Sequence, residues 1–156
     1  MARRRRRSSG LTARETAAAY AVAPVIVDSN VIIDVLENDP HWVEWSTDQL
    51  EPLVAARRAV VNPIIYAEIA ANFAEIETLE QALADFHLLR EQLPWDAAFM
   101  ASQAYKLYRK RGGTKRSPLP DFYIGAHASI AGYALLTRDP KRYREYFPKL
   151  RLISPA

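Results

Sequence analysis

The most informative stretch of this 156-residue chain is Val25-Ile26-Val27-Asp28-Ser29-Asn30. Three β-branched residues in a row are typical of a short strand that is buried on both faces, as in a parallel sheet. The polar residues end the strand, and apolar residues then recur at helical spacing from Val31 to Leu36. A buried strand that passes directly into a helix is the first unit of an α/β fold.

The same alternation continues along the chain. Strands are predicted at 59–61, 133–137 and 151–153. Helices are predicted at about 41–56, 62–75, 77–91, 96–111, 121–131 and 141–147. Asn62 and Pro63 suit the start of one helix, whereas Pro52 is expected to bend or divide another. The pattern predicts a three-layer α/β/α sandwich with a mainly parallel central sheet.

The charges are distributed unevenly, although the net charge is only +3. Residues 1–24 carry six Arg and one Glu, residues 25–104 carry fourteen acids and three Arg, and residues 105–156 carry twelve Lys or Arg and three acids. We expect a basic, disordered extension over 1–24 ahead of a single folded domain over 25–156. Such a split suggests that a polyanion or an acidic partner approaches one face.

Several classes of protein are excluded or disfavoured by composition. The chain has no cysteine, which excludes disulfides and thiolate metal sites. No apolar run reaches the roughly 18 residues that span a bilayer. The run Arg3–Arg7 imitates a secretory signal poorly, because the charged residues Arg14 and Glu15 interrupt the segment after the arginines. We therefore expect a cytoplasmic protein that does not associate with a membrane.

Four acids stand at positions that a parallel sheet would bring together. Asp28 and Asp139 each follow a predicted strand, and ligands bind at the carboxyl ends of strands in such sheets. Glu68 lies early in a helix among Ile and Ala, and Asp121 begins another helix. Clustered carboxylates repel one another unless a cation neutralises them, and ligand sets of oxygen alone favour Mg²⁺ or Mn²⁺. The pattern predicts a metal site that activates water against a phosphodiester.

Each acid taken alone has another possible role. Asp28 and Asp121 could cap helices or complement their dipoles, and Asp139 could begin a turn. Glu68 has the weakest alternative, because a carboxylate among apolar side chains needs a partner. The prediction depends on the joint arrangement, within which Asp28 and Asp121 are the preferred direct metal ligands.

The chain also resembles a known family over about residues 25–155. The motifs that carry the resemblance are Val27-Asp28-Ser29-Asn30, Tyr66-Ala67-Glu68-Ile69, Pro120-Asp121-Phe122-Tyr123-Ile124-Gly125-Ala126-His127-Ala128 and Leu136-Thr137-Arg138-Asp139. In this order they resemble PIN domains, and more narrowly the VapC toxins of bacterial toxin–antitoxin pairs. The arginine-rich extension departs from the family, whose members begin almost at the first strand.

The resemblance implies an endoribonuclease that depends on Mg²⁺ or Mn²⁺ and inhibits translation as a toxin. The acids of the family correspond to Asp28, Glu68, Asp121 and Asp139. The resemblance further implies that Thr137 orients an acid or a water and that Asn30 supports the first acid. It also implies a homodimer, and inhibition by a cognate VapB-like antitoxin whose C-terminal segment lies across the active-site groove.

Some interpretations stay open at this point. Asp34 could support the site from behind the acids, but it is interpreted as a solvated or capping acid. His127 is interpreted as a packed or hydrogen-bonded histidine in preference to a base. The basic cluster Lys106–Arg116 either holds RNA phosphates or is a solvated helix end. A phosphatase-type hydrolase is disfavoured, because such enzymes place a second acid where this chain has Asn30. A non-catalytic RNA-binding or regulatory module is the remaining alternative, and the presence of all four acids argues against it.

Overall fold

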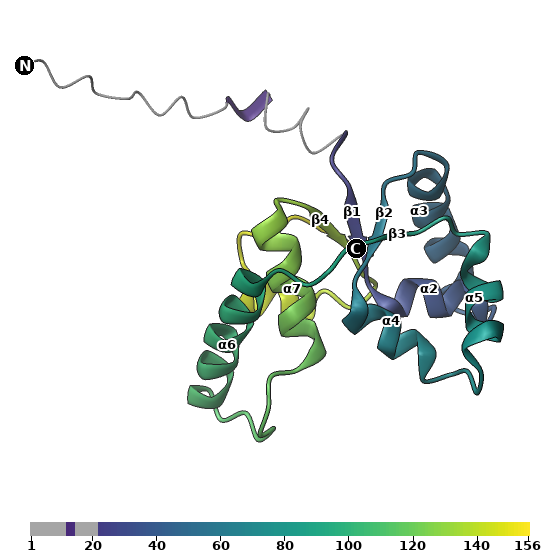
Figure 1. Ribbon diagram of the computed structural model, residues 1–156. Helices are drawn as coiled ribbons and strands as arrows, with labels where there is room; N and C mark the ends of the chain where they lie inside the picture. Colours follow the sequence, from purple (N-terminus) through teal and green to yellow (C-terminus); the bar gives the residue numbers. More distant parts are fainter. Residues whose placement is uncertain (1–11, 15–21) are drawn as a thin grey trace, which may run out of the picture.

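The computed structural model describes residues 12–14 and 22–156 of the chain (Figure 1). The described residues form a five-stranded sheet in the order β3-β2-β1-β4-β5, and every pair of neighbouring strands is parallel. The strands are β1 (Val25–Val27), β2 (Ala59–Val61), β3 (Leu89–Arg90), β4 (Ala134–Leu136) and β5 (Leu152–Ile153). The basic extension predicted for residues 1–24 falls mostly outside the described residues.

Helices cover both faces of this sheet. They are α2 (Ser29–Leu36), α3 (Val43–Ala55), α4 (Pro63–Ala70), α5 (Ile76–Ala84), α6 (Trp95–Lys110), α7 (Pro120–Ala131) and α8 (Lys141–Tyr146). The strand order runs outward from β1 in both directions, so right-handed crossovers place α2 to α5 on one face and α6 to α8 on the other. Figure 1 shows these two groups on opposite sides of the strands. The predicted α/β/α sandwich is confirmed, with a sheet that is parallel throughout.

The core follows directly from the apolar runs in the sequence. Every residue of β1, β2 and β4 is buried, as expected for strands with helices on both faces. Asn62 caps α4 by accepting a hydrogen bond on Oδ1 from the Ile65 N–H at 3.0 Å. Gly132 ends α7 with a φ of 71°, a conformation that glycine adopts without steric cost. No helix in the described part of the chain is long and apolar enough to cross a membrane.

The structure corrects three of the predicted elements. The helix predicted over 77–91 ends at Ala84. His87, in the turn that follows, has a φ of 46°, and the edge strand β3 comes next. A strand of two exposed residues is too short to leave an alternating pattern in the sequence. Helix α4 ends at Ala70 instead of near residue 75, and α3 continues through Pro52 undivided. Pro52 stands in the last turn of α3, where the loss of its N–H removes a single helical bond.

The sheet order also locates the expected binding edge. The chain passes from β1 to β2 on one side and later places β4 on the other side of β1. A parallel sheet opens a crevice at the carboxyl ends of the strands where the order reverses in this way. Asp28 follows β1 and Thr137 follows β4, so both residues lie at that crevice.

Candidate active site

Asp28 is the centre of a buried polar cluster at the carboxyl end of β1. Its side chain is only 4% exposed. The residue occupies the N-cap position of α2, yet its side chain accepts no capping hydrogen bond from that helix. Instead its Oδ2 accepts hydrogen bonds from Thr137 Oγ1 at 2.8 Å, Tyr143 OH at 3.0 Å and Asn30 Nδ2 at 3.2 Å. The side chain of Asp28 therefore does not cap α2, although the residue stands at its N-cap position.

Thr137 is the residue that joins the end of β4 to the first turn of α2. Its hydroxyl is fully buried and donates its proton to Asp28. The same oxygen accepts hydrogen bonds from Asn30 Nδ2 at 3.2 Å and from the Asp139 N–H at 3.1 Å. Asn30 Oδ1 in turn accepts a hydrogen bond from the Arg138 N–H at 3.3 Å. These contacts fix the hydroxyl beside Asp28.

The carboxylates of Asp28, Glu68 and Asp121 influence one another electrostatically. The pKa of Asp28 is raised to about 6, mainly by burial and also by the negative charges of Asp121 and Glu68, while hydrogen bonds from Thr137 and Tyr143 oppose the increase. Glu68, half-buried in α4, accepts a hydrogen bond on Oε2 from Ser29 Oγ at 2.8 Å. Burial and the charge of Asp121 also raise the pKa of Glu68. The structure thus brings together three of the four predicted acids.

Asp121 lies in the first turn of α7 and forms an ion pair with α8. Its Oδ2 is 2.5 Å from Nη1 of Arg142, and the two side chains are 28% and 45% exposed. Burial and the charge of Asp28 raise the pKa of Tyr143, the next residue in α8, well above its usual value. The phenol therefore keeps its proton and remains a donor to Asp28 near neutral pH. Helix α8 supplies a contact to each of two acids.

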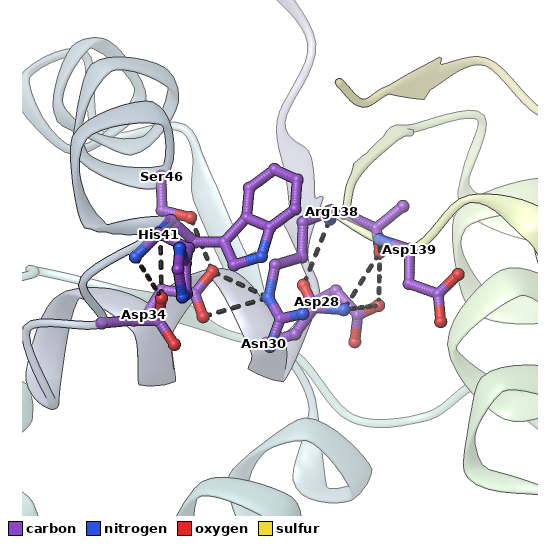
Figure 2. A network of polar contacts seen from close by, with 10 residues as sticks. Asp28, Asn30, Asp34, His41, Ser46, Arg138 and Asp139 are labelled. Carbon is purple, nitrogen blue, oxygen red and sulfur yellow. Dashed lines mark hydrogen bonds and ion pairs between the residues drawn. The ribbon is translucent and has the colours of Figure 1, made fainter. Parts of the chain in front are cut away.

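Asp139 lies at the margin of this cluster. Its backbone N–H is bonded to Thr137, but its side chain is exposed and makes no hydrogen bond or ion pair with the described residues. Figure 2 shows its carboxylate apart from the contacts that surround Asp28. The assignment of Asp139 as a fourth metal ligand stays a prediction.

The three grouped acids fit a hard divalent cation in their chemistry. Within residues 12–14 and 22–156, no three His, Asp or Glu side chains lie close enough together to hold a metal ion as they stand. The donors at the cluster are nevertheless oxygens alone, and their charges repel one another. Oδ2 of Asp28 accepts three hydrogen bonds, whereas Oδ1 accepts none from a described residue. Asp28, Glu68 and Asp121 are the acids whose chemistry suits Mg²⁺ or Mn²⁺, and their assignment as metal ligands stays a prediction.

A second buried acid, Asp34, ties α3 to the loop that follows β4. It is 1% exposed, and it accepts hydrogen bonds from Ser46 Oγ at 2.8 Å and from Arg138 Nε at 3.0 Å. The Arg138 guanidinium also lies 5.7 Å from the centre of the Trp42 ring. Figure 2 follows this network from Ser46 through Arg138 to Asn30 and Asp28. The interpretation of Asp34 as a solvated or capping acid is wrong, because this residue of α2 is buried where α2 packs against α3.

The remaining candidates lie outside the acid cluster. His127 is 1% exposed, with Nδ1 3.1 Å from Asn62 Nδ2 and Nε2 3.4 Å from Glu91 Oε2. Burial lowers the pKa of His127, and its interpretation as a hydrogen-bonded core histidine is confirmed. In the basic cluster, Arg109 Nη1 donates to the carbonyls of Gly113 at 2.9 Å and Lys115 at 3.3 Å. These bonds order the end of α6 and are compatible with both interpretations of the cluster.

Three residues of the cluster were missed by sequence reasoning, namely Ser29, Arg142 and Tyr143. Each had a weak positional signal, because Ser29 directly follows Asp28 and the other two lie in α8, the first helix after β4. A buried tyrosine usually finds a partner for its hydroxyl, and Tyr143 is 1% exposed. The sequence does not reveal that this burial occurs or which acid is the partner.

The chain was compared with protein families and solved structures. No curated protein gives a significant match. The crystal structure of VapBC2 from Rickettsia felis bound to a promoter DNA fragment has a TM-score of 0.65 at 18% identity, covering 85% of this chain and 98% of that chain. The crystal structure of DNA-bound VapBC from Salmonella typhimurium has a TM-score of 0.63 at 19% identity, covering 85% of this chain and 98% of that chain. The crystal structure of FitAcB from Neisseria gonorrhoeae has a TM-score of 0.60 at 23% identity, covering 83% of this chain and 96% of that chain.

Likeness at these identities supports the fold alone, whereas the family comparison extends to the sequence. The sequence model of the PIN domain matches residues 25–147, which include β1 to β4 and all of α8. The match contains Asp28, Glu68 and Asp121, the three acids that the structure groups, as well as Thr137. The chain therefore belongs to the PIN-domain family.

Proposed function

We propose that this protein is a Mg²⁺- or Mn²⁺-dependent endoribonuclease of the VapC type, which hydrolyses RNA phosphodiester bonds as the toxin of a toxin–antitoxin pair. The observation that carries the catalytic part is the burial of Asp28 beside Glu68 and Asp121 at the sheet crevice. A buried carboxylate with acidic neighbours calls for a cation. Membership of the PIN-domain family supports nuclease chemistry at such a site.

The residues of the cluster have distinct roles in this proposal. Asp28, Glu68 and Asp121 hold the divalent cation, and Asp139 joins them as the fourth acid. The cation supplies the Lewis acidity that attack of water on a phosphodiester requires. Thr137, Asn30 and Tyr143 hold Oδ2 of Asp28, so this carboxylate would be kept in one orientation for a cation. The hydroxyls of Thr137 and Tyr143 thus orient the acid without supplying a charge of their own.

The proposed biological role depends on the structural neighbours. They include VapBC assemblies and a structure described as a toxin–antitoxin complex from Klebsiella pneumoniae, which supports an antitoxin as partner of this chain. We place the nuclease in residues 25–156, acting as a homodimer in the cytoplasm, with residues 1–24 as a basic extension. A VapB-like antitoxin inhibits it by covering the acid cluster, and free toxin stops translation by cutting RNA.

The catalytic proposal is tested with purified protein and a mixture of structured RNAs. Cleavage is expected with Mg²⁺ or Mn²⁺ and is lost in EDTA. Asp28→Asn should abolish cleavage, while Asp48→Asn, which removes an exposed acid of α3, should cleave like the wild type. Equal cleavage by Asp28→Asn and wild type would refute the site. RNA binding without cleavage of any RNA would instead favour the non-catalytic regulatory module.

The toxin role needs a separate experiment in cells. Induction of the wild-type chain should arrest growth and translation, and induction of Asp28→Asn should not. Co-expression of the product of the adjacent gene should restore growth and protect the acid cluster in a purified complex. Continued growth during accumulation of a chain that cleaves RNA in vitro would contradict the toxin role and leave the nuclease intact. Mapping the RNA ends after brief induction identifies the substrate.

A further inference from the structure

Arg142 places a positive charge of the protein itself on one of the acids. Its Nη1 lies 2.5 Å from Asp121 Oδ2, and no other described cation forms an ion pair with Asp28, Glu68 or Asp121. Arg142 is the second residue of α8, whose next residue, Tyr143, donates to Asp28. The guanidinium is therefore held at the cluster by the same short helix that orients the central acid.

A divalent cation and Arg142 have to compete for Asp121. A guanidinium keeps its charge at every physiological pH, so the ion pair persists wherever Asp121 is ionised. The pair occupies an oxygen of Asp121 and reduces the negative potential that attracts metal to the cluster. Because two ligands that exclude each other weaken each other's binding equally, removing Arg142 must strengthen metal binding.

The displaced arginine has a natural second partner. Its side chain is 45% exposed, and a guanidinium matches a phosphodiester with two parallel hydrogen bonds. Lys141 and Arg144 are also exposed on this helix, and although Glu145 is exposed there too, the exposed side chains of α8 carry a net positive charge that would attract a phosphate. We propose that Arg142 is an exchangeable cation, which pairs with Asp121 in the metal-free protein and moves to an RNA phosphate once a divalent cation occupies that acid. This inference rests on the proposed metal-dependent ribonuclease function.

The first test measures metal affinity, independently of cleavage. Mn²⁺ is titrated calorimetrically into wild type, Arg142→Ala and Arg144→Ala. Arg144 is the matched control, because it is an exposed arginine of α8 that contacts Ser154 Oγ and none of the acids. A partly exposed ion pair corresponds to a change of about two- to fivefold in the dissociation constant. Arg142→Ala should bind Mn²⁺ more tightly by this factor, with Arg144→Ala unchanged. Unchanged or weaker binding by Arg142→Ala would overturn the inference.

The second test measures binding of a slowly cleaved phosphorothioate RNA over a range of salt concentrations. Loss of one phosphate contact lowers the slope of log K against log salt by about 0.7 for single-stranded RNA. Arg142→Ala should lower the slope in Mn²⁺ but leave it unchanged in EDTA, where Asp121 holds the wild-type arginine. Arg142→Lys keeps the charge but lacks the paired donors of arginine, so its slope in Mn²⁺ should fall between the slopes of wild type and Arg142→Ala. An equal decrease in EDTA and in Mn²⁺ would overturn the exchange.

The two proposals fail in different ways. If wild type binds no Mn²⁺, or binds it equally after Asp121→Asn, the metal site of the proposed function is wrong and the exchange is wrong with it. If wild type binds Mn²⁺ and loses it in Asp121→Asn while Arg142→Ala matches wild type, only the exchange is wrong. Circular dichroism of each variant in EDTA verifies that it is folded, and Arg142→Lys provides the comparison if Arg142→Ala does not fold.

Discussion

Replacing Asp28 by asparagine is expected to make the metal-free protein more stable near neutral pH. At that pH Asp28 is ionised, although it is 4% exposed and has Glu68 and Asp121 as neighbours. An asparagine keeps a carbonyl oxygen that can accept the hydrogen bonds now made to Oδ2, and it removes the buried charge. The residue proposed as the central metal ligand is thus one that the fold accommodates at a cost, as often occurs at active sites.

The size and pH dependence of this effect follow from the pKa of Asp28. The pKa is about 6 in the folded protein, against an ordinary value of 3.8 that the unfolded chain retains. Between these two values the folded state binds more protons, so Asp28 lowers stability progressively as the pH rises through this window. At about 1.4 kcal/mol per pH unit of difference, the full cost above pH 6 is roughly 3 kcal/mol. The gain from Asp28→Asn should vanish below about pH 4.

Urea denaturation in EDTA, near pH 7.5 and again near pH 4, measures this difference. We expect Asp28→Asn to unfold at a higher urea concentration than wild type near pH 7.5. The gain in the free energy of unfolding should be about 2–3 kcal/mol, because the amide oxygen of asparagine is a weaker acceptor than the carboxylate. The control Asp48→Asn should stay close to wild type at both pH values, since that acid is exposed. Saturating Mn²⁺ should stabilise wild type and not Asp28→Asn. Lower stability of Asp28→Asn near pH 7.5 would refute the electrostatic cost assigned to Asp28.

Three further changes test other contacts. Tyr143→Phe removes a hydrogen bond that lowers the pKa of Asp28, so the pH below which Mn²⁺ binding is lost should move upward in calorimetric titrations; an unchanged pH profile would contradict this. Asp34→Ala leaves Arg138 and Ser46 without their shared acceptor and should lower the free energy of unfolding by about 2–3 kcal/mol, measured in urea. A loss of less than about half a kcal/mol would show that the network contributes little to stability. Gly125→Ala would place a Cβ 2.6 Å from ring carbons of Phe147 and should cost about 1–2 kcal/mol in thermal unfolding, whereas a stabilised variant would show that the α7–α8 contact can relax.

Much of the fold could be predicted because its signals are local. The β-branched run before Asp28 marks a strand buried on both faces, and Asn62 with Pro63 marks a helix start that the structure reproduces to the residue. Gly132 likewise marks the end of α7. Asp28 could be placed at the crevice from sequence because it follows a parallel strand. The same rule also selected Asp139, which lies at the margin of the cluster, while Glu68 and Asp121 reach Asp28 from helices α4 and α7.

The features that escaped prediction depend on contacts between distant segments. β3 has two residues and is defined by its pairing with β2, so the segment before it reads as a continuing helix. The burial of Asp34 results from the packing of α2 on α3 and from Arg138, which is 104 residues away in sequence. The contact of Arg142 with Asp121 depends on how α8 meets α7, and a basic residue in a short helix does not predict it. Polar residues of this kind become informative only once their neighbours are known.

Because β1 lies between β2 and β4, the polar cluster around Asp28 can assemble only late in the synthesis of the chain. Asp28 leaves the ribosome early, but its partners Thr137 and Tyr143 come 109 and 115 residues later. At about 5–20 residues per second, the ribosome needs on the order of 10 seconds to add that stretch of chain. Throughout this interval the central acid has neither of these hydroxyl donors, so an incomplete chain lacks the assembled cluster. If the proposed nuclease activity needs this cluster, each copy stays inactive until it is nearly complete, which would leave time for the proposed antitoxin to be made.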